Sequence, residues 1–241
     1  LFEIAPEEMG SPALAAQMGQ AALRSDGTQL DSQLPAKTVG KLHAWEGRNG
    51  EVLQEMGLAP SLLHMFEPWF VGLTVSIVDM TQRGLDPKLG LDQHFAAAAR
   101  EAGKPTAGLE TGAQQIAFLD GMDKDEQLQF LDEALGEAAD GAAELERLHG
   151  AWRRGDATML WSGMAVDMQR QYPRLYRAIN IDRNDAWVPK LEGRLKAPGA
   201  DDTLVVVGAL HLLGSDGVVE KLRAKGYTVE RICSACAAGT K

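Results

Sequence analysis

The sequence has few cysteines, no long apolar run and no cluster of basic residues, and each shortage excludes a class of protein. Its two cysteines are too few for the four ligands of a structural zinc site, and no histidine lies near them. The best candidate for a membrane span, 68–78, is shorter than the roughly 18 apolar residues that are needed and is flanked by Glu67 and Asp79. The longest basic cluster is Arg153-Arg154 and the formal net charge is −10, which argues against a nucleic-acid partner.

Several catalytic motifs are also missing from the sequence. It contains no Gly-x-Ser-x-Gly elbow, no phosphate-binding P-loop and no dinucleotide-binding glycine pattern. The composition, with 45% hydrophobic and 24% charged residues, is that of a globular chain. We therefore expect chemistry to come from individual polar side chains that the fold brings together.

The two cysteines form the pair Cys233-Ser-Ala-Cys236 near the end of the chain. A thioredoxin-like motif would open a helix after the first strand, whereas this pair follows the last predicted strand. The spacing favours a local disulfide, with two unpaired thiols as the alternative. A disulfide would indicate an oxidising compartment, so we expect a periplasmic or secreted protein, with a cytoplasmic one as the alternative. No signal peptide is visible, but Leu1 already lies in a predicted strand, so one that has been removed is compatible with the sequence.

The most distinctive segment is Thr203–Gly214, which is apolar as far as Gly208 and then carries His211. This pattern predicts a buried parallel strand that delivers a histidine to its carboxyl end. Two more short strands are predicted at 1–4 and 104–110, and they carry the carboxylates Glu3 and Glu110. Because the carboxyl ends of parallel strands meet in one crevice, we expect the three side chains to converge.

An imidazole together with carboxylate oxygens suits a divalent metal such as Mn, Co or Zn, which can activate a water molecule. For each of the three residues taken singly, a capping or hydrogen-bonding role is the alternative. Arg183, in Asp182-Arg183-Asn184, has two interpretations as well. It forms a surface ion pair while Asn184 or Asp185 caps the next helix, or it points inward and holds a carboxylate through a bidentate contact.

Helical patterns fill most of the remaining chain. They predict helices at about 6–26, 36–57, 60–82, 90–103, 123–152, 156–181, 184–196 and 214–226, and a last strand at 227–232. His43, His64, His94 and His149 lie in these patterns without a second histidine four residues on, so we interpret them as structural. We predict a single α/β domain over 1–241, with a central, mainly parallel sheet. A large helical insertion, about 36–196, would be interrupted by the short strand near 105–110.

The predicted helix at 60–82 is apolar on nearly every side and contains Pro68, which should kink it. Such a helix is buried in the core or covered by a partner. Core packing is the favoured interpretation, and a homodimer surface or a lid over the site are the alternatives.

Five segments taken together resemble the TraB/GumN family in order and approximate spacing. They are Gly90-Leu-Asp92-Gln-His-Phe, Gly103-Lys-Pro-Thr-Ala-Gly-Leu-Glu110-Thr-Gly-Ala-Gln-Gln115, Asp182-Arg-Asn184-Asp-Ala-Trp187, Val206-Val-Gly-Ala-Leu-His211-Leu-Leu-Gly-Ser-Asp-Gly217 and Leu222-Arg-Ala-Lys-Gly-Tyr-Thr-Val-Glu-Arg231. The resemblance implies an α/β fold shared with haem-binding ChaN-like and erythromycin-esterase-like proteins. It also implies kinship with the Tiki metalloproteases, which use two Gly-x-x-His motifs and a glutamate with Mn or Co.

The resemblance assigns roles to four residues of this chain. Gly208-Ala-Leu-His211 matches the second Gly-x-x-His motif, and Glu3 matches the glutamate of the early strand. Glu110 and Arg183 match the family's Leu-Glu-Thr and Glu-Arg-Asn positions, with Asp182 in place of the glutamate. The first Gly-x-x-His would lie before Glu3, so we expect the chain to be incomplete at its N-terminus. Many bacterial relatives carry secretion signals, which agrees with the disulfide interpretation.

Two functions follow as hypotheses. In the first, the protein is a metal-dependent hydrolase, with a peptidase favoured, in which His211 and Glu3 bind metal or water. Glu110 and Arg183 would orient ligands and stabilise charge. In the second, the protein is not a catalyst and binds a peptide or small ligand in the same crevice, with the apolar segment 62–80 lining a groove.

Overall fold

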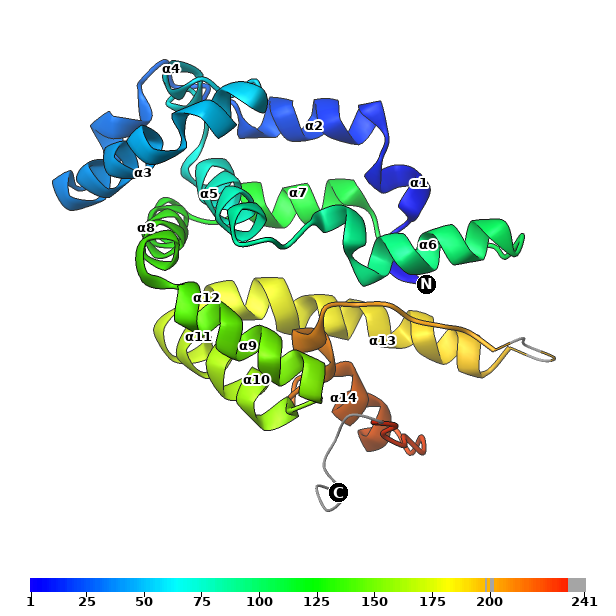
Figure 1. Ribbon diagram of the computed structural model, residues 1–241. Helices are drawn as coiled ribbons and strands as arrows, with labels where there is room; N and C mark the ends of the chain where they lie inside the picture. The colour runs from blue at the N-terminus through cyan, green and yellow to red at the C-terminus, as the bar shows by residue number, and fades with distance from the viewer. Residues whose placement is uncertain (198, 200–201, 234–241) are drawn as a thin grey trace. The chain divides into compact units, whose positions relative to one another are not determined.

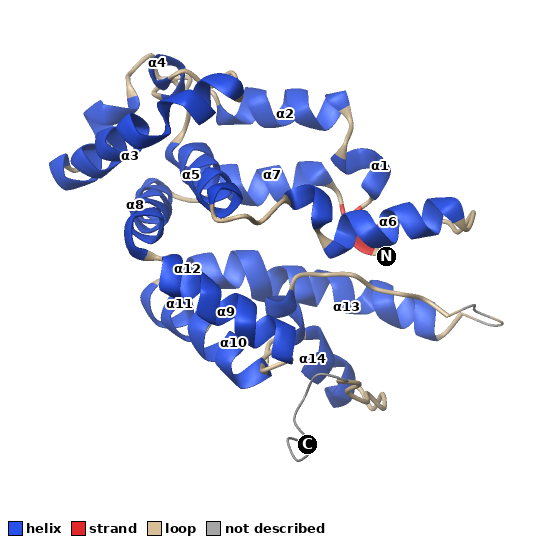
Figure 2. Cartoon of the chain, viewed as in Figure 1, coloured by secondary structure: helices blue, strands red, loops and turns tan. Residues whose placement is uncertain are grey.

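The computed structural model describes residues 1–197, 199 and 202–233, most of which lie in helices (Figures 1 and 2). The chain divides into two compact units. Unit 1 comprises Leu1–Met9, Leu91–Thr111 and Glu144–Lys241, and unit 2 comprises Gly10–Gly90 and Gly112–Ala143. The single domain with an insertion over 36–196 stays a prediction.

Unit 1 contains a small parallel sheet. β1 (Phe2–Ile4) pairs with β2 (Gly108–Glu110), so that Phe2 lies opposite Gly108 and Ile4 opposite Glu110. The segment around Val206 runs parallel to β1 on its other side, with a bridge from Val206 to Phe2. The backbone N–H of Val206 donates to the carbonyl of Leu1 at 2.8 Å. The carboxyl ends of three parallel segments therefore meet at one edge.

The predicted central sheet is much smaller than expected, and only its parallel direction is confirmed. The segment 203–208 is in the predicted place but forms a single bridge, because the three-residue strand beside it offers few backbone groups. The predicted strand 227–232 is not a strand in the structure. Within residues 1–197, 199 and 202–233 no strand pairs with this alternating segment, and Ile232 is almost fully exposed.

Within its described residues, unit 1 also contains ten helical elements. They are α1 (Pro6–Met9), α6 (Leu91–Glu101), α9 (Ala142–Arg154, which counts in unit 1 from Glu144), α10 (Ala157–Met164), α11 (Val166–Gln171), α12 (Pro173–Tyr176), the π-helical turn η3 (Arg177–Ile181), α13 (Asp182–Leu195), the 3₁₀ turn η4 (Ala209–Leu212) and α14 (Val218–Ala224). Of these, α1 contacts β1 and α13 contacts β2. A buried cluster joins β2, α13 and α14 through Leu109, Trp187, Leu191 and Val218. This cluster holds α13, and the polar residues at its start, against the sheet edge.

Unit 2 is helical apart from one antiparallel bridge, Leu23 to Phe66. Its elements are α2 (Pro12–Ala22), η1 (Leu30–Gln33), α3 (Ala36–Glu55), α4 (Pro60–Leu63), α5 (Pro68–Gln82), η2 (Pro87–Leu89), α7 (Gly112–Asp120) and α8 (Lys124–Asp140). α5 packs on α8 so closely that a Cβ on Gly72 would lie 2.9 Å from the ring of Phe130. The core interpretation of this apolar helix is therefore confirmed, while the homodimer through 60–82 stays a prediction.

Four predicted helices are wrong as continuous elements, and the chain shows why. The helix at 6–26 is interrupted after Met9, because Ser11 precedes Pro12 and adopts an extended conformation, and it ends at Ala22. The helix at 60–82 is interrupted at 64–67, because Glu67 precedes Pro68 and adopts an extended conformation. The helix at 156–181 is broken at Tyr172, which precedes Pro173 in the same way. The helix from Asp123 begins with the predicted capping box to Glu126, but it stops at Gly141 before α9 begins. The spacing of apolar residues alone does not show where a helix is interrupted.

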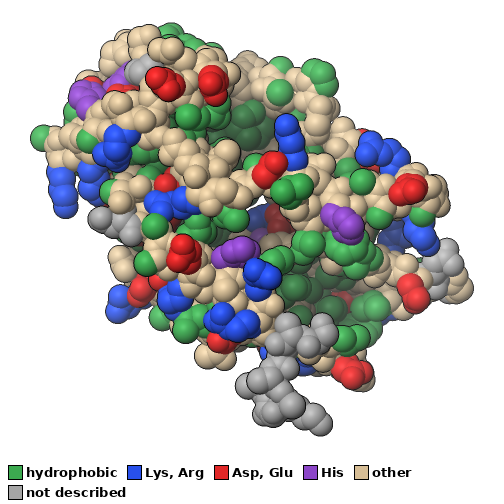
Figure 3. Space-filling model, in the orientation of Figure 1, with side chains coloured by type: hydrophobic (Ala, Val, Ile, Leu, Met, Phe, Trp, Pro, Cys, Tyr) green, Lys and Arg blue, Asp and Glu red, His purple; other side chains and the backbone are tan. Residues whose placement is uncertain are grey.

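The charge and cysteine patterns can be compared with the structure directly. On the face shown in Figure 3, basic and acidic side chains are interspersed. None of the helices in the described part of the chain is both long and apolar enough to cross a bilayer. Cys233 takes part in a disulfide, and Cys236, the other cysteine of the predicted pair, lies outside the described residues.

Candidate functional site

The four residues singled out in the sequence lie together in unit 1, with the guanidinium of Arg183 at their centre. Its Nη2 donates to Glu3 Oε2 at 2.5 Å and to Glu110 Oε1 at 2.6 Å, and its Nε lies 3.0 Å from Glu110 Oε1. Its Nη1 lies 3.1 Å from His211 Nε2. Arg183 thus points inward and holds carboxylates from two neighbouring strands. We call Glu3, Glu110, Arg183 and His211 the arginine cluster.

His211 is buried, and its tautomer follows from the hydrogen bonds of Asn184. The Asn184 amide nitrogen donates to the carbonyl of Asp216 at 2.8 Å, which turns its oxygen Oδ1 toward His211 Nδ1, 2.8 Å away. Nδ1 therefore carries the proton and donates it, while Nε2 keeps its lone pair and accepts from Arg183. Burial, assisted by the Arg183 charge, lowers the pKa of His211 to about 4 although Glu3 and Glu110 act to raise it. The imidazole is neutral at pH 7.

Trp187 completes the surroundings of the cluster. Its indole N–H donates to Glu110 Oε2 at 3.1 Å, and the Arg183 guanidinium carbon lies 4.8 Å from the centre of its ring. The imidazole of His211 is 4.4 Å from the same ring, centre to centre. Arg183, Asn184 and Trp187 come from the start of α13, and Arg183 also donates to the carbonyl of Ile179 in the π-helical turn before it.

Two of these residues are not predicted as site residues by the sequence. In the sequence Asn184 fits the role of a helix cap, and Trp187 has no assigned role. The signal that could have found them is their spacing, because positions 183, 184 and 187 share one face of a helix. Asp92 also belongs near the cluster, since burial and then the charge of Glu3 raise the pKa of its carboxyl.

Comparison with known proteins decides what kind of chain carries this cluster. Residues 1–231 match the TraB/PrgY/gumN family. The chain belongs to this family. The resemblance seen in the sequence is thereby confirmed over nearly its whole length.

The relatives of this TraB/PrgY/gumN member include "Uncharacterized protein YbaP" of Escherichia coli K12, which is 30% identical over 173 residues. That match covers 71% of this chain and 62% of the relative, and the protein of the same name from Shigella flexneri matches equally well. The chain therefore spans less than two thirds of the length of the curated relatives it matches. No solved structure matches the chain.

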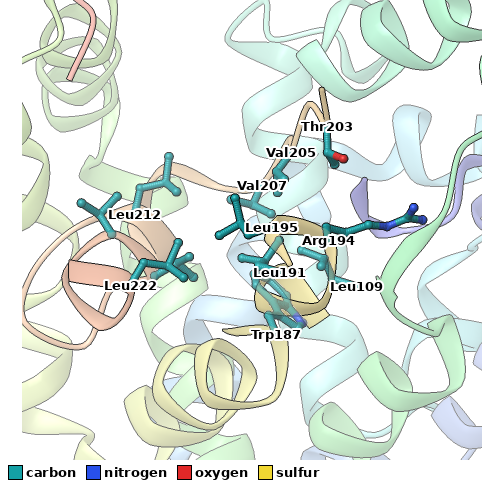
Figure 4. A pocket seen from close by; sticks show the side chains of 12 residues that line it. Leu109, Trp187, Leu191, Arg194, Leu195, Thr203, Val205, Val207, Leu212 and Leu222 are labelled. Atoms are coloured by element: carbon teal, nitrogen blue, oxygen red, sulfur yellow. The ribbon is translucent and has the colours of Figure 1, made fainter. Parts of the chain in front are cut away.

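Next to the arginine cluster, unit 1 of this TraB/PrgY/gumN chain has an apolar cavity of about 220 Å³ (Figure 4). Leu191 and Leu195 from α13, Val205 and Val207 from the segment beside β1, and Leu222 from α14 line it. Trp187 lines it too, so one indole contacts the cavity, His211 and Glu110. A ligand in the cavity would therefore contact a ring that also contacts the cluster.

The nitrogen and oxygen atoms of the arginine cluster can be compared with the ligand atoms that a divalent metal ion requires. His211 Nε2 has a lone pair and lies 3.8 Å from Glu3 Oε1, so an imidazole nitrogen and a carboxylate oxygen adjoin. Glu3 Oε1 meanwhile accepts from the backbone N–H of Gly208 at 2.8 Å. The two donors fit a divalent ion in type and spacing. Such an ion would have to replace the Arg183 hydrogen bond to Nε2.

Proposed function

We propose that this TraB/PrgY/gumN protein is a metal-dependent hydrolase, with peptides as the favoured substrate class, and that the arginine cluster is its centre. The observation that carries the proposal is the neutral His211, whose Nδ1–H is held by Asn184 while Nε2 keeps its lone pair, which accepts from Arg183, 3.8 Å from Glu3 Oε1. Metal-binding histidines usually have this arrangement, with the second ring nitrogen bound to an oxygen that fixes the tautomer. The ChaN-like sheet implied by the resemblance remains part of this proposal.

Each residue has a role in the proposed site. His211 and Glu3 would hold Mn, Co or Zn, and the ion when bound would polarise the scissile carbonyl and activate a water. Arg183 stays paired with Glu110 and provides a fixed positive charge for developing negative charge on the substrate. Asn184 and Trp187 orient His211 and Glu110. Two protein ligands are fewer than the three of catalytic zinc sites, so the proposal requires another, which the family resemblance places before Glu3.

The test is peptide hydrolysis by the full-length protein with added Mn or Co, using a library of quenched fluorescent peptides. We expect His211→Gln to abolish hydrolysis and metal binding at this site, and His149→Gln, at an exposed position of α9, to change neither. Glu3→Gln should weaken metal binding while the far-UV circular dichroism stays the same. Absence of hydrolysis in the full-length protein, or unchanged metal binding in both variants, would contradict the proposal.

The apolar cavity supports a second candidate function, binding of a peptide or small apolar ligand without catalysis. Leu195 lines the cavity and is itself 57% exposed, so Leu195→Asp should fold normally. We expect this variant to bind a hydrophobic fluorescent probe several-fold more weakly, with Leu89→Asp, at a more exposed leucine of unit 2, as the control. If both variants bind the probe equally, the cavity is not the binding site.

We also propose a periplasmic or secreted location, which the disulfide at Cys233 supports. The experiment is trapping of thiols in intact cells with a mass-shifting alkylating reagent. A protein that gains no mass until it is reduced agrees with the proposal. Two reactive thiols would instead indicate the cytoplasm.

A further inference from the structure

We propose that unit 2 holds a divalent transition metal, zinc being the best match, on Asp31, His43 and His64. One ligand atom from each residue lies within 4.8 Å of the other two. His43 Nε2 is 2.8 Å from Asp31 Oδ2, and His64 Nδ1 is 3.0 Å from Asp31 Oδ1. We call these residues together with Glu46 the histidine cluster. This proposal is independent of the function proposed for unit 1.

The types of ligand atom select the metal. Two imidazole nitrogens and one carboxylate oxygen are a ligand set of zinc sites that keep a fourth position open to water. The same set also binds Fe(II), which is a separate outcome of the test below. Calcium and magnesium are disfavoured because they prefer all-oxygen surroundings.

Glu46 supplies the second contact that a metal-binding histidine normally makes. The other ring nitrogen of His64, Nε2, lies 2.8 Å from Glu46 Oε1, and Glu46 is nearly buried. A carboxylate in this position orients the imidazole and raises its affinity for metal. Glu46 and His43 are three residues apart on α3, so the same helix face carries one ligand and the group that orients another.

One oxygen of the histidine cluster lacks the donor that a buried carboxylate needs. Asp31 Oδ1 is buried and has no hydrogen-bond partner, although His64 Nδ1 lies 3.0 Å from it. The ring N–H of His64 is therefore not aimed at this oxygen. Among the described residues, the ion pairs of Asp31 and Glu46 are with imidazoles alone. A buried unsatisfied oxygen is rare in native proteins, and a cation beside Asp31 would satisfy it.

The backbone around the ligands is fixed by the core of unit 2. Each ligand adjoins a fully buried leucine in the sequence, namely Leu30 before Asp31, Leu42 before His43 and Leu63 before His64. The backbone N–H of Leu30 also donates to the carbonyl of His64 at 3.0 Å, which ties η1 to the segment after α4. The ligands are thus held in place, and His43 is exposed enough for an ion to enter. Histidine and carboxylate atoms adjoin on the surface near α3 and α4 in Figure 3.

The experiment is a titration of the chelator-treated chain with ZnCl₂, followed by calorimetry and by thermal unfolding, and with CoCl₂, followed by visible absorption. We expect a zinc site that raises the midpoint of thermal unfolding and gives the absorption of Co²⁺ bound to nitrogen and oxygen. Asp31→Asn and His64→Gln should each weaken zinc at least tenfold, and Glu46→Gln roughly 10- to 100-fold.

Three control variants show whether zinc binds at the histidine cluster or elsewhere on the chain. His43→Gln, at a half-exposed side chain, should leave the fold intact and still weaken zinc, so a loss of binding there is not a loss of folding. His94→Gln, at an exposed histidine of unit 1, should leave zinc binding unchanged. In His211→Gln the zinc site that depends on His43 and His64 should persist. Failure of the wild-type chain to bind zinc, tighter binding of Fe(II) than of zinc under anaerobic conditions, or unchanged zinc affinity in the His43→Gln/His64→Gln variant overturns the proposal.

Discussion

In unit 1 a guanidinium lies between two glutamates and a histidine, whereas in unit 2 the imidazole of His64 lies between two carboxylates and that of His43 adjoins one of them. Arg183 is charged at every accessible pH, so the arginine cluster carries its own compensating cation. The histidine cluster gains a positive charge only from a proton or from a bound ion. The difference teaches that similar residue types give a preformed ion-pair network in one place and a site for an added cation in the other.

The largest expected effect comes from removing the fixed cation of the arginine cluster. Arg183→Met leaves Glu3 and Glu110 without their partner in a mostly buried position, which should lower the free energy of unfolding by about 3–5 kcal/mol. Arg170→Met breaks a pair exposed on both sides and should cost less than about 1 kcal/mol. Urea unfolding measures both. Equal losses in the two variants would mean that the arginine cluster stabilises the fold no more than an exposed ion pair does.

The next effect is a pH dependence that belongs to the arginine cluster. In the unfolded chain His211 binds a proton near its ordinary pKa of 6.5, but in the folded chain its pKa is about 4. Protonation of His211 therefore favours the unfolded state as the pH falls from about 6.5 toward 4. Above pH 6.5 the residue does not change the free energy of unfolding with pH. We expect a loss on the order of 2 kcal/mol over this range that is missing in His211→Gln. Parallel unfolding curves for wild type and variant from pH 7 to pH 4 would refute the shift.

A smaller effect tests whether the arginine cluster also depends on neutral donors. Trp187→Phe keeps a ring against His211 but removes the indole N–H that donates to Glu110, which should cost about 1–2 kcal/mol. Trp152→Phe, at a half-exposed position, should cost less than about 0.5 kcal/mol. Thermal unfolding of the two variants at neutral pH gives the comparison.

The smallest effect is expected in the histidine cluster without metal. Asp31→Asn in the chelator-treated chain should change the free energy of unfolding by less than about 1 kcal/mol, because Asp31 is partly exposed and faces imidazoles with no fixed charge. With zinc at about a hundredfold above its wild-type dissociation constant, the same variant should be less stable than wild type by at least about 1.3 kcal/mol, because it binds zinc at least tenfold more weakly. A large metal-free loss would show that the histidine cluster is an ion-pair network like the arginine cluster.

The sequence predicted the arginine cluster better than the fold around it. Glu3, Glu110 and His211 could be brought together because the carboxyl ends of parallel strands share an edge, even though the strands themselves are very short. The extent of the sheet could not be predicted, since an apolar run does not say whether a neighbouring strand is available. Arg183 was chosen only through the family resemblance, because its own neighbours fit a helix cap equally well.

The histidine cluster was missed for a different reason. A search for two histidines four residues apart finds ligands on one helix, whereas His43 and His64 lie on α3 and after α4, and Asp31 lies on η1. They meet through the packing of Leu30, Leu42 and Leu63, and each of these leucines looks like any other core residue in the sequence.

The π-helical turn at 177–181 makes the length of the chain as important as its chemistry. Such a turn contains one residue more than the same stretch of α-helix. If all five residues of the turn wound as ordinary α-helix, everything after them would be rotated by about 100°. Arg183 would then swing away from both glutamates without any substitution in the cluster. A family member with a one-residue gap at this point would instead continue as a regular helix and keep both the motif residues and their arrangement.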